Sequence, residues 1–304
     1  MTGASPQFAG QVAGGRQSGP FMPPGLASAL GAFVIWGLFP LYIRFIAQVP
    51  AVEVVLHRSV WALLIVLGIL AAQRRWAWLA ESLRQPRRLL LFTVSALLLW
   101  ANWLVYVYAT QTGRVVEASL GYFINPLVSV LLGVLVLRER PRRVQWAAVA
   151  LATAGVAWLT FTAGRLPWIA LTLAATFGLY GLLRKTAALG ALEGLALESL
   201  LLAPVVVPAL AWWTVAHHGV LLAGPPALLG WLLLYGLLAA APLLLFANAA
   251  RQMPLASLGL VQYLSPTLQF MLGVWVFHEP LDHRRLLGFV LIWAGLALVS
   301  GQAL

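Results

Sequence analysis

Two charged residues, Arg58 and Glu198, lie inside long apolar stretches of this chain, 140 positions apart. A charge within an apolar segment of membrane-spanning length is costly, so it usually faces a cavity, a ligand or a partner. Arg58 suits an anionic ligand group and Glu198 a cationic group or a proton, and the neighbouring His57 leaves proton coupling open. The alternative for Arg58 is snorkelling to the lipid headgroups. We expect both charges to line a pathway without bonding to each other.

Uncharged polar residues form a second set of candidates. They fall in three apolar stretches, two of which contain a proline: Asn102, Trp103 and Tyr106; Tyr122 and Asn125 before Pro126; Gln262, Tyr263 and Gln269 around Pro266. Proline leaves a backbone carbonyl unbonded, which a polar side chain or water must satisfy. Asn125 and Gln262 could serve only that repair. Alternatively, matched kinks frame a central site where amide and phenol groups orient a polar substrate, with Trp36 and Tyr180 as aromatic walls.

Three further carboxylates stand near the starts of apolar stretches. Glu117 follows Arg114, and a pathway role and a helix-dipole role are equally good interpretations of it. We expect Glu53 and Glu193 to act as N-terminal caps or dipole partners. A third proline within an apolar stretch, Pro40, predicts another kink.

Catalytic chemistry finds little support in the sequence. No glycine-rich loop with a lysine is present to cradle a phosphate, and no Ser/His or paired-Asp arrangement falls inside an apolar stretch. The chain has no cysteine, which excludes disulfides and Cys-based metal sites. The histidines at 217–218 and near 278–283 fit polar turns better than metal sites. We therefore expect no enzyme activity, no cofactor and no metal.

The elements that must position these residues follow from composition. Hydrophobic residues make up 62% of the chain and charged residues 9%, which is typical of an integral membrane protein. A bilayer core requires about 20 mainly apolar residues per helix. Ten segments meet that length: 26–46, 52–72, 89–110, 116–137, 144–162, 166–183, 194–216, 227–250, 254–277 and 285–303. The prediction is an all-α integral membrane protein with ten transmembrane helices, because the alternation of a strand-built barrel is absent.

An internal repeat organises these segments. Ala118-Ser119-Leu120-Gly121, followed by Pro126, Gly133 and Glu139, recurs as Ala256-Ser257-Leu258-Gly259, followed by Pro266, Gly273 and Glu279. Two halves with five spans each must face opposite ways, as in many secondary transporters. We predict one repeat over 26–162 and a second over 166–304, preceded by a disordered cytoplasmic tail over 1–25. The fifth segment of each half has few polar residues and should pack peripherally.

The net charge of +11 fits membrane topology better than nucleic-acid binding. With a cytoplasmic N-terminus, thirteen basic residues fall inside: Arg16, Arg74, Arg75, Arg84, Arg87, Arg88, Arg138, Arg140, Arg142, Arg143, Arg184, Lys185 and Arg251. Five fall outside: Arg44, Arg114, Arg165, Arg284 and Arg285. Basic residues accumulate in cytoplasmic loops, so both termini should be cytoplasmic.

Several of these runs resemble one protein family. They are Trp36-Gly37, Glu53 with His57-Arg58, the run 117–127, the run 180–185, and Gln262-Tyr263 with Pro266. On these residues the chain resembles the RarD permeases, in the EamA branch of the drug/metabolite transporter superfamily. The resemblance covers nearly the whole chain after the tail. It implies ten helices in two inverted five-helix halves, an inner-membrane location and an exporter-like role. RarD proteins carry a chloramphenicol-sensitivity or -resistance label, which says little about the natural substrate.

Together these observations predict a permease that moves a small amphipathic metabolite or drug across the inner membrane by alternating access. An amino-acid-like or amphenicol compound is the expected cargo. The alternative is a membrane assembly or sensor partner without flux. We expect a small-molecule substrate and the lipid bilayer as partners, no nucleic acid, and a monomer or homodimer.

Overall fold

A computed structural model describes residues 24–74, 76–111, 115–163, 168–276 and 283–300, and all regular structure in them is helical. The elements are α1 (Leu26–Ile43), the 3-10 turn η1 (Arg44–Ile46), α2 (Ala51–Ala72), α3 (Ala77–Leu83), α4 (Pro86–Gln111), α5 (Val115–Leu135), α6 (Arg143–Ala163), α7 (Trp168–Thr186), α8 (Ala191–Ala216), α9 (Val220–Ala223), α10 (Pro226–Gln252), α11 (Leu255–Val261), α12 (Leu264–Trp275) and α13 (His283–Ser300). The predicted tail over 1–25 lies almost wholly outside the described residues.

Each predicted apolar segment coincides with a helix. The ninth contains two, α11 and α12, because the helix is interrupted at Gln262 and Tyr263. Pro266 has no N–H to bond the Gln262 carbonyl, which accepts the Ser265 N–H instead at 3.2 Å. Six helices are long and apolar enough to cross a membrane, namely α1, α2, α4, α6, α8 and α10, and shorter apolar helices lie within α5 and α13. The all-α membrane class is thus confirmed.

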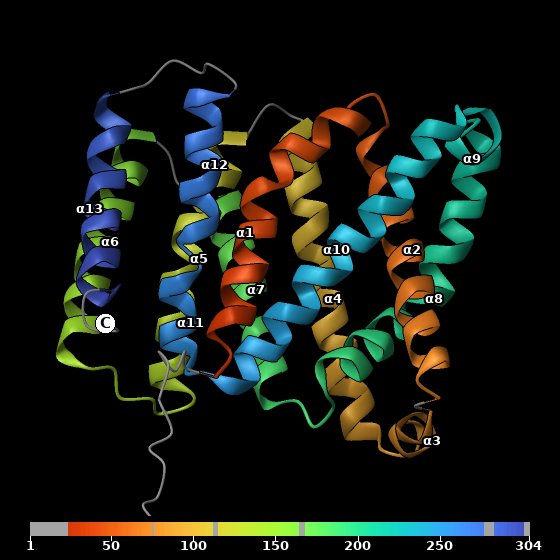
Figure 1. Cartoon of the computed structure of the whole chain (residues 1–304), viewed down its shortest axis with the longest axis horizontal. Helices are drawn as coiled ribbons and strands as arrows, with labels where there is room; N and C mark the ends of the chain where they lie inside the picture. The colour runs from red at the N-terminus through yellow and green to blue at the C-terminus, as the bar shows by residue number, and fades with distance from the viewer. Residues whose placement is uncertain (1–23, 75, 112–114, 164–167, 277–282, 301–304) are drawn as a thin grey trace, which may run out of the picture.

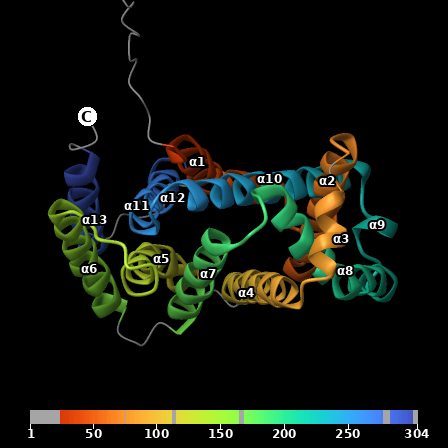
Figure 2. The ribbon, with the colours of Figure 1, turned by 90° about the horizontal axis from the view of Figure 1, so that it is seen from below.

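The helices form two layers, seen edge-on in Figure 2. One layer contains α4, α7 and α5, and the other contains α10, α1, α12 and α11. The pair α2 and α8 closes one end of the bundle, and α6 packs against α13 at the other end (Figures 1 and 2). The two segments with few polar residues, α6 and α13, therefore lie at the periphery of the bundle.

A close helix approach fixes the middle of the bundle. A Cβ added to Gly259 in α11 would lie 2.7 Å from the Pro126 carbonyl oxygen of α5. Real Cβ atoms do not approach that closely, so only glycine lets α11 pack here. This contact brings the Pro126 region of α5 close to the segment that leads to Pro266, next to the polar residues that precede each proline.

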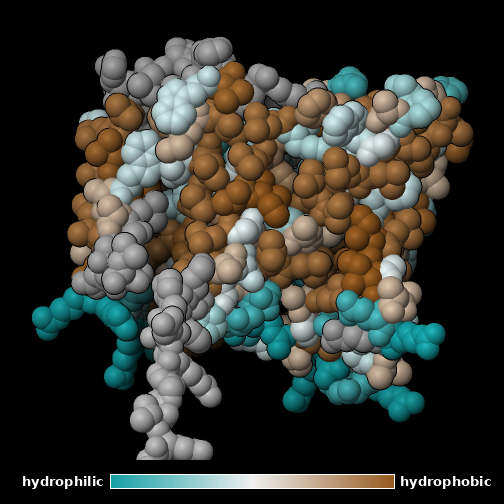
Figure 3. Space-filling view, in the orientation of Figure 1, coloured by the Kyte–Doolittle hydropathy of each residue, from teal (hydrophilic) through white to brown (hydrophobic). Residues whose placement is uncertain are grey.

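Hydrophilic residues gather at one edge of the molecule. Figure 3 shows a broad hydrophobic band with strongly hydrophilic side chains along the lower edge, the edge that carries α3 in Figure 1. The basic residues near that edge include Arg84, Arg87, Arg140 and Arg142. The short helix α9 lies at the opposite edge. A band of this kind is the surface expected of a protein that spans a bilayer.

Candidate functional site

A central cavity lies between the two layers, towards the α9 edge. It is lined by residues of α1, α4, α5, α7, α10 and the ninth segment: Phe33, Trp36, Phe39, Pro40, Ile43, Asn102, Trp103, Tyr106, Tyr122, Asn125, Phe177, Tyr235, Leu243, Gln262, Ser265, Pro266 and Gln269. It leaves about 80 Å³ of room for water. A single water needs about 10–15 Å³ on this measure. The cavity can therefore hold a few waters and must widen to admit a larger molecule.

Four carboxamides line the central cavity. Asn102 donates to the Leu173 carbonyl at 2.9 Å and to Thr176 Oγ1 at 2.8 Å, which ties α4 to α7. Gln269 Nε2 donates to the Trp36 carbonyl at 3.1 Å. These two amides hold helices in place while they face the cavity.

The other two carboxamides have free acceptors. Gln262 Nε2 donates to Ser129 Oγ at 3.1 Å, but its buried Oε1 has no hydrogen-bond partner, and the buried Oδ1 of Asn125 has none either. Neither side chain bonds a kinked backbone carbonyl, so the repair role considered for them is not seen among the described residues. Two buried acceptors beside a cavity are suited to bind a ligand donor or water.

Aromatic rings form the remaining walls. Trp36 lies 5.5 Å from Phe177, centroid to centroid and edge-on, and Tyr106 lies 6.0 Å from Tyr122. Tyr180, predicted as a wall, lies one layer deeper and stacks on Phe246 outside the cavity lining. The site combines flat apolar surfaces with a few polar groups, which is typical of small-molecule pockets.

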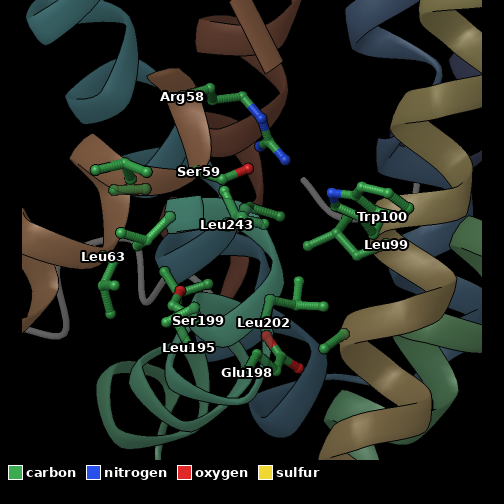
Figure 4. Close-up of a pocket in the computed structure, with 16 residues that line it drawn as sticks. Arg58, Ser59, Leu63, Leu99, Trp100, Leu195, Glu198, Ser199, Leu202 and Leu243 are labelled. Carbon is green, nitrogen blue, oxygen red and sulfur yellow. The ribbon is translucent and has the colours of Figure 1, made fainter. Parts of the chain in front are cut away.

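Arg58 and Glu198 face a different space, a lateral cavity between α2, α4, α8 and α10 (Figure 4). Its lining includes Ser59, Leu99, Trp100, Ser199, Leu202 and Leu243. In Figure 4 the two charged side chains enter this cavity from opposite ends. No ion pair joins them among the described residues, as expected.

Arg58 is 5% exposed and has no carboxylate partner among the residues the structure describes. Its guanidinium carbon lies 4.1 Å from the centroid of the Trp103 ring, and Trp103 lines the central cavity. Arg58 therefore stands in the wall between the two cavities. A cation–π contact stabilises a buried guanidinium only partly, since it does not neutralise the charge. Snorkelling to the bundle surface is not observed.

Glu198, in contrast, has a counter-ion and a hydrogen-bond donor. Its Oε1 accepts from Ser95 Oγ at 2.5 Å and lies 3.5 Å from Arg184 Nη1. Arg184 is fully buried, and its Nη2 donates to the carbonyls of Gly190 and Ala191 at 3.3 and 3.0 Å. The position of Arg184 at the end of an apolar segment predicts an ordinary loop charge, so its pairing with Glu198 was not predicted from the sequence. The other carboxylate oxygen, Oε2, has no hydrogen-bond partner.

Several predicted residues lie away from both cavities. His57 accepts from Trp61 Nε1 at 3.0 Å and lies 3.6 Å from Glu53. Glu53 accepts the Val220 N–H at 2.6 Å, so it caps α9 rather than its own helix. Tyr263 is buried in an apolar cluster with Ile292. Pro126 lies inside α5 and lines neither cavity, and Glu117 is in the first turn of α5, with a side chain outside the described set.

A polar clamp at the α3 edge was also missed. Glu139 accepts the backbone N–H groups of Leu255 and Ala256 at 2.8 and 2.9 Å, at the start of α11. Lys185 lies 3.6 Å from Glu139 and donates to the Met253 carbonyl at 2.7 Å. The repeat that contains Glu139 was the available signal. The clamp joins α7 to the junction of α10 and α11, which closes the bundle below the central cavity.

The fold and cavities define a multi-helix membrane protein with a polar, aromatic-lined space at its centre. The EamA-like transporter family model matches residues 23–161 and 166–301, so the chain belongs to that family and is a membrane transporter. It is 46% identical over 289 residues to protein RarD of Streptomyces exfoliatus, covering 92% of this chain and 89% of that protein. An uncharacterized transporter of Pseudomonas aeruginosa is 44% identical over 284 residues, covering 92% and 94%. The resemblance to RarD proteins is thereby confirmed.

A solved crystal structure with 18% identity matches at a TM-score of 0.68, over 92% of this chain and 97% of that one, and it supports the fold alone. No group of three metal-ligating side chains comes together within the described part of the chain. His217, one of the histidines considered for metal binding, stacks on Trp213 with centroids 4.2 Å apart.

Proposed function

We propose that the chain is a secondary transporter that moves a small amphipathic metabolite or drug through the central cavity by alternating access. The observation that carries this proposal is the pair of buried, unpartnered amide oxygens of Asn125 and Gln262, which face one cavity from corresponding regions of the two halves. Asn102, Tyr106 and Tyr122 complete the polar lining. An amino-acid-like or amphenicol compound would place its flat apolar part between Trp36 and Phe177.

Two inverted five-helix repeats, 26–162 and 166–304, would place the site on a pseudo-twofold axis. The helix contacts support this organisation. Exchanging α1 with α7, α2 with α8, α4 with α10, α5 with α11–α12 and α6 with α13 converts each of the most extensive helix pairs into itself or into another observed pair. For example, α1 packs on α10 and α12, and α7 packs on α4 and α5. All ten segments then span the membrane, with α11 and α12 as one broken span.

The α3 edge would face the cytoplasm, together with both termini, in a bacterial inner membrane. The hydrophilic, Arg-rich edge in Figure 3 supports this orientation because basic residues mark cytoplasmic loops. The central cavity then lies on the outer side of the Glu139–Lys185 clamp. Alternating access requires that clamp to open while the opposite side closes. Because the pathway lies within one chain, a monomer suffices, whether or not copies associate.

Arg58 would reach the substrate when the central cavity widens. It stands behind Trp103, so a shift of this ring opens a route from the cavity to the guanidinium. Arg58 would then meet an anionic substrate group. Glu198 would take a cationic group or a proton through its free oxygen, Oε2. Proton coupling through Glu198 or His57 belongs to this proposal.

Counterflow in liposomes tests the proposal. Purified chain is reconstituted with unlabelled chloramphenicol, or an aromatic amino acid, inside, and uptake of the labelled compound is followed. We expect wild-type uptake to exceed that of empty liposomes and the double variant Asn125→Ala, Gln262→Ala to lose about tenfold, since two ligand hydrogen bonds are removed. Asn248→Ala is the matched control, because Asn248 bonds Ser28 outside both cavities. An equal loss of uptake in the control would contradict a role for the central cavity. Absence of uptake for both chloramphenicol and the aromatic amino acid would favour the non-transporting alternative.

A further inference from the structure

The lateral cavity is a separate space with its own walls. It shares only Leu243 with the central cavity, and it leaves about 50 Å³ of room for water. Apolar side chains of α2, α4 and α8 form most of its surface, including Leu63, Leu99 and Leu202. The proposed transport route uses Arg58 and Glu198 but not the apolar chamber between them, so this chamber needs its own explanation.

The lateral cavity lies near mid-height of the bundle, and Val207 is the one exposed residue of its lining. Its lining on α8 runs from Leu195 to Val207, the middle of a helix that spans Ala191–Ala216, and Val207 is 45% exposed. On α4 the lining lies at Ala96–Trp100, again in the middle of the helix. Hydrocarbon surrounds the outward faces of helix centres in a bilayer, so the exposed Val207 places this end of the cavity, its mouth, beside lipid.

Polar atoms without partners face this lipid-side cavity. Among the described residues, Arg58 Nε, Trp100 Nε1 and Glu198 Oε2 are buried and have no hydrogen-bond partner. Figure 4 shows the Arg58 guanidinium and the Trp100 indole nitrogen directed to the same region, with Glu198 at the far end. Two N–H donors thus converge where a ligand acceptor would bind both.

The charge balance of the cavity selects the sign of the ligand. Glu198 already has the Arg184 guanidinium at 3.5 Å. Arg58 has the Trp103 ring and no acid within the described residues. The cavity therefore carries one uncompensated positive charge in a low-dielectric setting, where an opposite charge is strongly favoured.

From these observations we propose that the lateral cavity is a second binding site, for the carboxylate of a small amphiphile that enters from the bilayer. The carboxylate accepts from Arg58 and the Trp100 N–H, and the apolar body lies along Leu99 and Leu202. Pro204 and Pro208 leave carbonyls of α8 unbonded beside the mouth, which lets this helix wall adjust to the ligand. The site goes beyond transport, because binding there requires no passage across the membrane.

Equilibrium binding tests the chemistry of this site. We would titrate 1-naphthoate into the detergent-purified full chain by calorimetry, with 1-naphthamide as the uncharged counterpart. The expected result is saturable naphthoate binding that weakens about tenfold or more in Arg58→Gln and for naphthamide, and less in Arg58→Lys. Absence of saturable naphthoate binding, or equal binding of naphthamide, would overturn the proposal.

Steric variants locate the ligand. Ala203→Leu and Ser199→Val narrow the lateral cavity without touching Arg58, and Val205→Leu, on the exposed side of α8, is the matched control. Binding should fall about tenfold in a narrowing variant that keeps the wild-type melting temperature, and should stay within about twofold in Val205→Leu and Gln262→Ala. If naphthoate binding were lost in Gln262→Ala but retained in both narrowing variants, the ligand would be assigned to the central cavity instead. Counterflow of the same proteins separates failure of this site from failure of the transport proposal.

The route of entry is tested with a single nitroxide. The chain has no cysteine, so Val207→Cys gives one unique labelling position at the mouth. In lipid nanodiscs the label should collide more with oxygen, which concentrates in hydrocarbon, than with a water-soluble nickel chelate. Preferential collision with the nickel chelate would show a mouth open to water and would overturn entry from the bilayer.

Discussion

Arg58 in α2 and Glu198 in α8 lie 140 residues apart, the spacing of the sequence repeat, yet their surroundings differ. Glu198 is bonded to Ser95 and paired with Arg184, whereas Arg58 has an aromatic ring and no acid among the described residues. The same backbone position therefore holds a compensated charge on one side of the bundle and an uncompensated one on the other. The ion pair ties Glu198 to α7, and the lack of one at Arg58 is the reason for the ligand role proposed for it.

The sequence explains why only one side is compensated. At the 140 offset, the position of Gly194 in α8 is taken by Val54 in α2, and at the neighbouring 141 offset Ile43 stands where α7 has Arg184. A Cβ at Gly194 would collide with the Arg184 guanidinium. Arg58 would need an acid as its counter-ion, but the first segment has the apolar Ile43 where α7 has its charged Arg184, so no equivalent ion pair forms around Arg58.

The largest effect is expected from Arg184→Met. This substitution leaves Glu198 buried without a counter-ion, and the free energy of unfolding should fall by about 3–5 kcal/mol. Thermal or denaturant unfolding in detergent measures the change. Adding Glu198→Gln to Arg184→Met should recover a substantial part of it, because the unpaired charge is removed. If Arg184→Met left the free energy of unfolding unchanged, the ion pair would not stabilise α8.

A smaller effect is expected from Gly194→Ala. The new methyl group overlaps Arg184, and the strain should lower the free energy of unfolding by about 1–3 kcal/mol. Gly68→Ala in α2 is the matched control, since its Cβ would meet nothing within 4 Å and alanine favours a helix by about 1 kcal/mol. If both variants melt alike, the close fit around Arg184 is refuted.

Lys185→Met should have the smallest effect on stability. Lys185 is adjacent to Arg184 in sequence, but it is partly exposed and its contacts are two carbonyls and Glu139. Its loss should lower the free energy of unfolding by about 1 kcal/mol, measured as for Arg184→Met. A loss as large as that of Arg184→Met would show that burial does not distinguish these neighbours.

The helical segments were predictable because apolar length and proline position are local properties. The cavity lining also followed, in part, because Asn102 and Tyr106 share a helix face and Asn125 and Gln262 precede prolines. Whether those residues bind a substrate stays a prediction. The break at Gln262 falls where Pro266 leaves a carbonyl unbonded, but Pro126 leaves α5 continuous. Tertiary packing decides between these outcomes.

Burial of individual charges could not be predicted from local sequence. Arg184 and Lys185 both stand in the last turn of α7 and look like ordinary loop-end charges. Only the return of the chain at Gly190 places carbonyls of the next helix over Arg184. Similarly, Glu53 caps α9, whose start lies 167 residues away. Such partners depend on the fold of the whole chain.

The contrast between Arg58 and Glu198 is tested most directly by measuring counterflow and melting temperature of Arg58→Ala together. Because Arg58 is buried with no acid partner among the described residues, its removal should not lower the free energy of unfolding. Uptake of the labelled aromatic amino acid should nevertheless fall at least about tenfold, since a charge-assisted bond to its carboxylate is lost. Full uptake in a stable Arg58→Ala protein would contradict the ligand role of Arg58, and severe destabilisation would assign it to the fold instead.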